Sequence, residues 1–192
     1  RHVISSIGAP ETERLIMGDV PAGVGPTPPG RLSFVETITV LNREPTAFGW
    51  GDDTIVFFND SERFEYASPQ ADVDTRSGVI CLPNNFEYRP GQCLPEGLLR
   101  VTCLARPDVW SAWPEDEYRA AKGRWFTAVQ DSARRFLPLP MGAVTPEAAV
   151  VATDMFTPRT ITRYTGHFGG AIYGSPVKNR HGRTALDNLY LC

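Results

Sequence analysis

The amino-acid sequence predicts an α+β fold, a mostly antiparallel sheet of five or six strands covered by helices. Strand-like apolar segments recur at 31–41, 55–58, 64–66, 79–82, 98–105 and 150–156. One segment, 114–137, has the three-and-four spacing of an amphipathic helix. Seventeen prolines and seventeen glycines indicate many turns between these elements.

The composition is that of a globular domain with a packed core. Of the 192 residues, 42% are hydrophobic and 21% are charged, and the formal net charge is -3. The negative charge and the absence of a Lys/Arg-rich run exclude a nucleic-acid partner. No apolar run approaches the roughly 20 residues of a membrane span. We therefore expect a cytoplasmic or membrane-peripheral protein.

Cysteine and histidine spacing does not predict a metal site. The four cysteines form no C-x-x-C pair, and the three histidines show no ligand spacing. We expect reduced, scattered thiols, with a zinc site as the main alternative.

The N-terminal part contains a strand at 2–6, a helix at 9–17 and a linker at 19–30 that is rich in Pro and Gly. In 31–41, apolar residues such as Phe34 and Ile38 alternate with Ser and Thr, which predicts a half-buried strand. Glu36 falls on the apolar side of that alternation.

The middle and C-terminal elements follow from capping and periodicity. In 98–105, Leu99, Val101 and Cys103 alternate with more polar residues. The helix at 114–137 begins with Pro and three acidic residues, which suit the positive end of its dipole. After the strand at 150–156, Thr157 is expected to cap a short helix that ends at Gly166. A glycine-rich loop, a basic turn at 178–183 and a strand-like run at 188–192 follow.

Common catalytic motifs are missing. The sequence contains no G-x-G-x-x-G after a strand, no G-x-S-x-G elbow, no H-E-x-x-H pair and no P-loop. Its one distinctive segment is 157–174, which reads TPRTITRYTGHFGGAIYG.

This segment resembles T-P-x-T-x-x-R-Y-T-G-x-x-G-G-A-I-Y-G, found near the C-terminus of flavin-dependent phytoene desaturases, carotenoid isomerases and retinol saturases. The run 188–192 looks like the strand that leads into that family's C-terminal flavin-binding motif. The run 2–10 is similar to the strand and turn that leave the flavin domain. The match at 157–174 is specific, whereas 31–140 matches only in pattern.

The resemblance implies a fragment of a larger enzyme. Residues 1–19 would be the exit segment of the FAD-binding domain, 31–140 the substrate-binding domain and 141–192 the return segment. FAD would bind the parent enzyme and not this fragment, which is expected to be inactive alone. The implied partners are a long apolar polyene or isoprenoid-like lipid, the missing FAD-binding domain, a peripheral membrane contact and a dimer through exposed apolar surface.

The resemblance also suggests site residues. The backbone of Gly169 and Gly170 would lie against the flavin, and Tyr164 and Tyr173 would be close to the substrate. No catalytic residue is assigned, and His167 is the weak candidate, because imidazole transfers protons near neutrality.

Several side chains have two interpretations. Glu36 is either a buried acid or, more commonly, a paired carboxylate. Arg159 and Arg163 either hold the loop or are solvated. Seven aromatic residues either line an apolar cavity or pack in the core: Phe34, Phe57, Phe58, Trp110, Trp113, Trp125 and Phe126. The alternatives to a flavoenzyme substrate domain are a stand-alone lipid-binding module and a structural interaction domain.

Overall fold

The computed structural model describes residues 1–18, 27–138 and 145–192, and it confirms the α+β class. The linker predicted at 19–30 lies mostly outside the described residues, as do 139–144, where two predicted domain segments meet. The strands are β1 Val3–Ser5, β2 Ser33–Leu41, β3 Ile55–Asn59, β4 Ser77–Cys81, β5 Gly97–Ala105, β6 Val150–Phe156 and β7 Leu189–Leu191. The α-helices are α1 Ala9–Met17, α2 Pro107–Ala112, α3 Glu115–Arg134 and α4 Pro158–Thr165.

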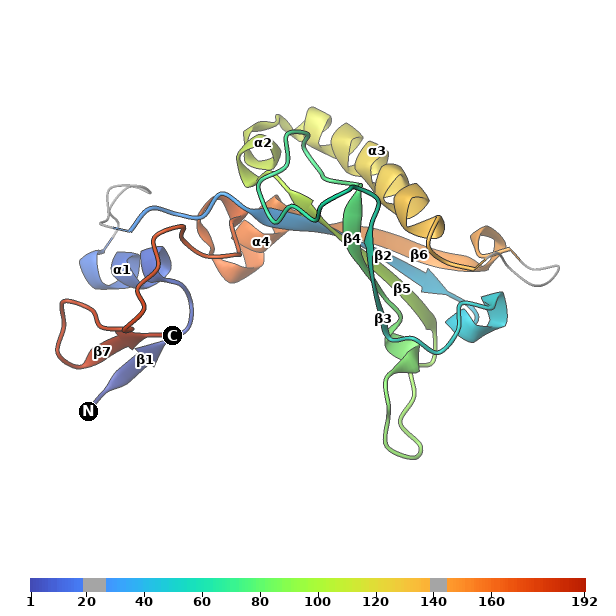
Figure 1. Cartoon of the computed structure of the whole chain (residues 1–192), viewed down its shortest axis with the longest axis horizontal. Helices are drawn as coiled ribbons and strands as arrows, with labels where there is room; N and C mark the ends of the chain where they lie inside the picture. The colour runs from blue at the N-terminus through green and yellow to red at the C-terminus, as the bar shows by residue number, and fades with distance from the viewer. Residues whose placement is uncertain (19–26, 139–144) are drawn as a thin grey trace.

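Five of the strands form one antiparallel sheet, in the order β3-β4-β5-β2-β6. Helix α3 lies across one face of this sheet (Figure 1). Val129 and Ala133 of α3 are buried there, together with Leu99, Val101 and Cys103 of β5. The alternation read in 98–105 is therefore confirmed, because these β5 side chains are the ones that face the helix.

In β2 the helix-covered side is the one rich in Ser and Thr. Ser33, Val35, Thr37 and Thr39 are buried, whereas Phe34 and Ile38 on the other side are half-buried. A polar residue of α3 makes this arrangement possible, since the Gln130 amide donates a 2.7 Å hydrogen bond to the Thr37 hydroxyl.

One local prediction was wrong, and one helix was missed. Residues 64–66 form no strand but lie in the long connection between β3 and β4, since three apolar residues are too few to specify strand pairing. Helix α2 was not predicted. Its start at Pro107 is a favourable first position, and it is held by Trp110, which is fully buried.

The segment after β6 folds as predicted. The Thr157 hydroxyl accepts a hydrogen bond from the Thr160 amide, and the Thr160 hydroxyl accepts one from the Thr157 amide, which completes a capping box. Gly166 ends α4 in the left-handed conformation at φ 74°.

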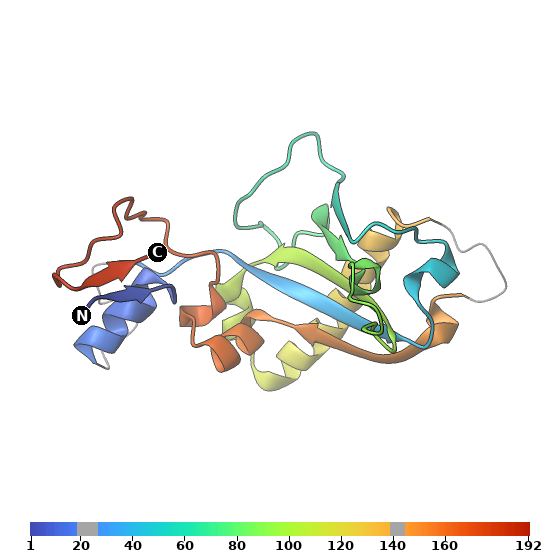
Figure 2. The ribbon, with the colours of Figure 1, turned by 90° about the horizontal axis from the view of Figure 1, so that it is seen from below.

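A second, two-stranded sheet lies to one side of the molecule. Strands β1 and β7 pair in parallel, with Val3 opposite Leu189 and Ser5 opposite Leu191. Together with α1 they form a small lobe, which contains both termini (Figures 1 and 2). Among the described residues, no helix combines the length and the apolar character that crossing a bilayer requires.

Candidate functional site

Among the residues that the structure describes, no helix covers the face of the five-stranded sheet opposite α3, and we call it the open face. In the view of Figure 2 the strands lie in front of α3, so that this face points toward the reader. Strand register places Glu36 opposite Thr102 and Val79 opposite Thr102, so these side chains share the open face. Phe57, which pairs with Val79, also points there and is 78% exposed. The exposed Phe57 ring on β3 lies beside the half-buried Val79 side chain of β4, so the two form one apolar surface.

An apolar cleft of about 490 Å³ lies on the open face over β3, β4 and β5. Phe57, Phe64 and Tyr66 line it together with Tyr173, which arrives from the glycine-rich segment. Its volume is within the usual range of small-molecule sites. Phe64 and Tyr66 belong to the segment that was expected to be a strand. A loop brings these rings to the cleft instead.

Tyr173 joins the cleft to the rest of the open face. Its ring lies 5.6 Å from that of Tyr66 and 6.2 Å from that of Phe34, and Phe34 in turn stacks on Phe156 at 6.1 Å. Burial, with smaller contributions from Tyr66 and Glu36, raises the pKa of the Tyr173 hydroxyl above its ordinary value. Tyr173 is therefore a neutral, partly desolvated phenol at the edge of an apolar cleft.

The structure treats the two predicted substrate-proximal tyrosines differently. Tyr173 is 39% exposed and borders the cleft, whereas Tyr164 is 70% exposed on α4. The Arg163 guanidinium lies over the Tyr164 ring at 5.4 Å. Tyr164 is not brought to the cleft.

Glu36 forms an ion pair with Arg100 on the open face, which decides between the two interpretations of its carboxyl group. Arg100 donates a hydrogen bond from Nε to Glu36 Oε1 at 2.5 Å, and the Thr102 hydroxyl lies 3.3 Å from Oε2. Glu36 is thus a paired carboxylate on a central strand. The same hydrogen bond raises the pKa of Arg100. Sequence reasoning missed Arg100, although an arginine inside an otherwise uncharged alternating strand was a usable signal.

The seven aromatic residues divide between the two faces of the sheet. Phe57 lines the cleft from the open face, and Phe34 lies beside it. Phe58 borders the cleft but is buried in the core, where its ring stacks on that of Phe136 at 4.8 Å. The other four pack into or against the core on the side of α2 and α3: Trp110, Trp113, Trp125 and Phe126.

The glycine loop contains two glycines with different surroundings. Both have positive φ, 59° for Gly169 and 76° for Gly170. A Cβ on Gly170 would lie 2.2 Å from the Pro158 carbonyl oxygen, whereas a Cβ on Gly169 would meet nothing within 4 Å. The Ser33 hydroxyl also donates a 2.5 Å hydrogen bond to the Gly170 carbonyl. Packing on α4 therefore accounts for Gly170, and only Gly169 borders open space.

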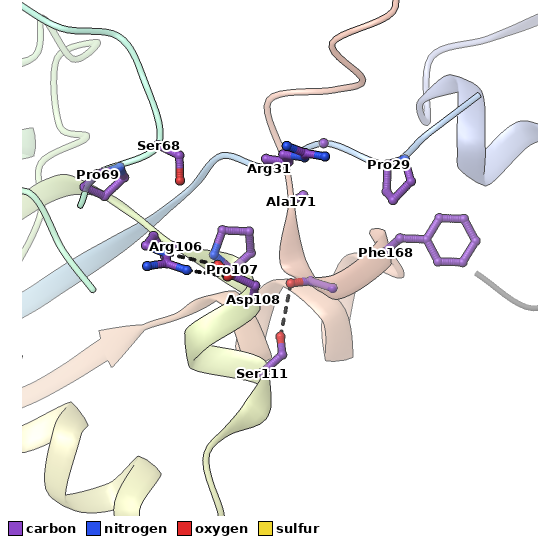
Figure 3. Close-up of a pocket in the computed structure, with 12 residues that line it drawn as sticks. Pro29, Arg31, Ser68, Pro69, Arg106, Pro107, Asp108, Ser111, Phe168 and Ala171 are labelled. Carbon is purple, nitrogen blue, oxygen red and sulfur yellow. Dashed lines mark hydrogen bonds and ion pairs between the residues drawn. The ribbon is translucent and has the colours of Figure 1, made fainter. Parts of the chain in front are cut away.

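The open space beside Gly169 is a second cavity, of about 600 Å³ (Figure 3). On one wall Arg106 is paired with Asp108 at 2.6 Å, and the Ser111 hydroxyl donates a 3.2 Å hydrogen bond to the carbonyl of Gly169. Figure 3 shows Arg106, Asp108 and Ser111 around this space. Ser111 thus fixes the loop against α2, with Gly169 at the cavity wall. A flat ligand could approach the backbone at this point without meeting a side chain on Gly169.

His167 contacts neither cavity. Its Nδ1 lies 2.7 Å from the hydroxyl of Thr165, within the same turn. The next residue, Phe168, donates its amide to the Glu11 carboxylate at 3.1 Å, which ties the loop to α1. These contacts describe a residue that shapes the turn, and they do not by themselves provide a route for proton transfer to the cleft.

Arg159 holds three helices together. Its Nε donates to the Trp110 carbonyl at 3.0 Å and its Nη1 to Glu115 at 3.3 Å, while the guanidinium lies 4.4 Å from the centre of the Tyr118 ring. Arg159 thus joins α4 to α2 and α3, next to the glycine loop, and its contacts indicate a structural role.

All four cysteines are free thiols: Cys81, Cys93, Cys103 and Cys192. Within 1–18, 27–138 and 145–192, no group of three or more His, Cys, Asp or Glu side chains is arranged to hold a metal ion. Burial raises the pKa of Cys103 to about 12, so this thiol is protonated and unreactive near neutrality.

No protein-family model matches the chain, and no match was found among curated proteins.

Proposed function

We propose that the chain is the substrate-binding portion of an FAD-dependent oxidoreductase that acts on a long apolar polyene or isoprenoid-like lipid. The observation that carries this proposal is the apolar cleft on the open face. Tyr173, from the segment that resembles the flavoenzyme family, forms one side of it, and Phe57 and Tyr66 form others. An elongated apolar ligand would bury these rings, so the expected ligand of the cleft is apolar.

The small lobe supports the proposal that 1–19 and 141–192 belong to a larger flavin-binding domain. Two paired strands are only marginally stable by themselves. The outer residues of this lobe include exposed apolar side chains, among them Ile4 and Leu15. Further strands beside β1 and β7 would cover them and complete a sheet.

The part of this chain that fits a flavin is the loop at Gly169. Its missing side chain leaves the 600 Å³ cavity open at the backbone, and Ser111 and Arg159 hold the surrounding helices in place. FAD would supply the electron transfer, while these residues would shape and dry the space beside it. The phosphate-binding motif would come from outside this chain, so the chain alone would not retain FAD.

The test compares the 192-residue chain with the longer protein that its coding sequence specifies. We expect the chain alone to be colourless and the longer protein to hold FAD and convert a polyene, measured by visible absorption and by chromatography of the products. A stoichiometric flavin on the chain alone, or a coding sequence without a dinucleotide motif, would contradict the proposal.

Two exposed aromatic residues provide a matched pair of variants for that test. Phe57→Ala removes a ring from the cleft, and Phe86→Ala removes one from the turn after β4, which does not line the cleft. We expect only Phe57→Ala to raise the KM for the polyene. Equal effects of the two variants would count against the cleft as the substrate site.

The main alternative is a stand-alone lipid-binding module, which the same cleft would serve. It predicts lipid binding by the chain and no flavin-dependent activity in the longer protein. A structural interaction domain, the third possibility, predicts neither. The exposed apolar side chains also make a peripheral membrane contact or a dimer part of the proposal, and vesicle flotation and sedimentation measure each directly.

A further inference from the structure

We propose that the lipid bound on the open face has one uncharged oxygenated end, a hydroxyl or a carbonyl, and that Arg100 binds this end. The inference rests on the proposed function, because it refines the ligand of the same cleft. It predicts a substrate that is not a pure hydrocarbon.

Arg100 lies beside the cleft on the same face. It is two residues from Thr102, which lines the cleft, so the two side chains leave β5 about 7 Å apart. Its neighbours across the sheet are Ile38 of β2 and Cys81 of β4. A ligand that extends from the cleft along β5 would reach Arg100 next.

The Arg100 guanidinium has N–H donors that make no hydrogen bond to the described part of the protein. Its Nε is used by Glu36, and within the described residues no protein partner is found for Nη1 or Nη2. The Arg100 side chain is 44% exposed beside the cleft, so a ligand that extends along β5 would find these N–H groups without a protein partner. An oxygen at the end of an apolar chain would accept a hydrogen bond from a charged donor there.

The charge of the pair selects an uncharged acceptor. Glu36 is largely buried and already neutralises Arg100, so the site has no net charge. A ligand carboxylate would share the guanidinium with the Glu36 carboxylate, and the two anions would repel. A hydroxyl or carbonyl avoids that repulsion.

Three retinoids that differ only at one end test the inference on the 192-residue chain. They are all-trans-retinol, retinoic acid, and axerophthene, the hydrocarbon with hydrogen in place of the hydroxyl. Tryptophan emission overlaps retinoid absorption, so quenching gives each Kd. We expect retinol to bind about tenfold or more tightly than axerophthene, as for a hydrogen bond to a charged donor, and more tightly than retinoic acid.

The informative variant removes both charges, Glu36→Gln with Arg100→Met, because Arg100→Met alone would leave a buried carboxylate without its partner. We expect this double variant to bind retinol and axerophthene equally, with axerophthene affinity within about twofold of wild type. The control removes the ion pair between α3 and the turn before β6, Arg134→Met with Glu147→Gln, and should keep the preference. Thermal melting checks that each variant is folded.

The outcomes separate the inference from the proposed function. Equal binding of retinol and axerophthene by the wild type, or tighter binding of retinoic acid, would overturn the role of Arg100 while leaving a lipid site in place. Retention of the preference in the Glu36/Arg100 double variant would do the same. Failure of all three retinoids to bind would overturn the lipid site as well.

Discussion

Alanine at Gly170 should destabilise the protein far more than alanine at its neighbour Gly169. Both positions have positive φ, where a Cβ costs about 1–2 kcal/mol. At Gly170 the new Cβ would also lie 2.2 Å from the oxygen and 2.7 Å from the carbon of the Pro158 carbonyl. Backbone at the start of a capped helix cannot move easily, so we add about 1–3 kcal/mol for overpacking.

The expected losses of unfolding free energy are therefore about 2–5 kcal/mol for Gly170→Ala and about 1–2 kcal/mol for Gly169→Ala. For a chain of this size, the difference corresponds to a melting temperature about 2–12 °C lower for Gly170→Ala. Circular dichroism melting and urea unfolding of the two variants measure it. Equal melting temperatures would refute the packing of Gly170 on α4.

The pair also separates folding from function. In the longer flavoprotein that we propose, Gly169→Val would place a branched side chain in the 600 Å³ cavity. We expect a loss of flavin content or turnover there that exceeds the loss of stability, whereas substitutions at Gly170 should lower stability first.

Four further predictions concern stability. Gly123→Ala should stabilise the protein by about 1 kcal/mol, because a Cβ at this position of α3 meets nothing within 4 Å. A urea unfolding midpoint that is lower than that of wild type, or equal to it, would contradict this. Thr39→Val should be neutral or stabilising by about 1 kcal/mol, since the buried Thr39 hydroxyl has no hydrogen-bond partner within the described part of the chain. Thr157→Ala should cost about 1 kcal/mol in urea unfolding through loss of the helix cap. Because the pKa of Cys103 is raised to about 12, its stabilising effect is complete below the unfolded thiol pKa near 8.5 and is lost as the pH rises toward 12. Wild type should therefore lose about 1–2 kcal/mol more than Cys103→Ala between pH 8 and pH 10.

The sequence was sufficient for elements whose local signals agree with their environment. Helix α4 has a Thr cap, Pro at its first position and Gly at its end, and it forms as predicted. The strand at 97–105 and the long helix α3 were recognisable because their apolar periodicity matches the face that each buries.

The features that make the candidate site depend on long-range packing. Tyr66 and Tyr173 are more than 100 residues apart, and their meeting at the cleft follows only from the path of the connections. The pairing of Glu36 with Arg100 needed the strand order, which places β2 beside β5. The sequence could not distinguish the space around Gly169 from that around Gly170, because that space depends on how closely the Pro158 carbonyl of α4 approaches the loop.

The place of β2 in the middle of the sheet has a consequence for biosynthesis. It is the first strand of the five to leave the ribosome, yet Glu36 pairs with Thr102 on one side and Phe156 on the other. At 5–20 residues per second, its second edge waits roughly 6–24 s for β6 to be made. An unpaired apolar strand is prone to aggregate during such a delay. The side of β2 that later faces α3 carries Ser33, Thr37 and Thr39, and these polar residues lower the aggregation propensity of the nascent strand. The unpartnered hydroxyl of Thr39 in the folded core is consistent with this role during synthesis.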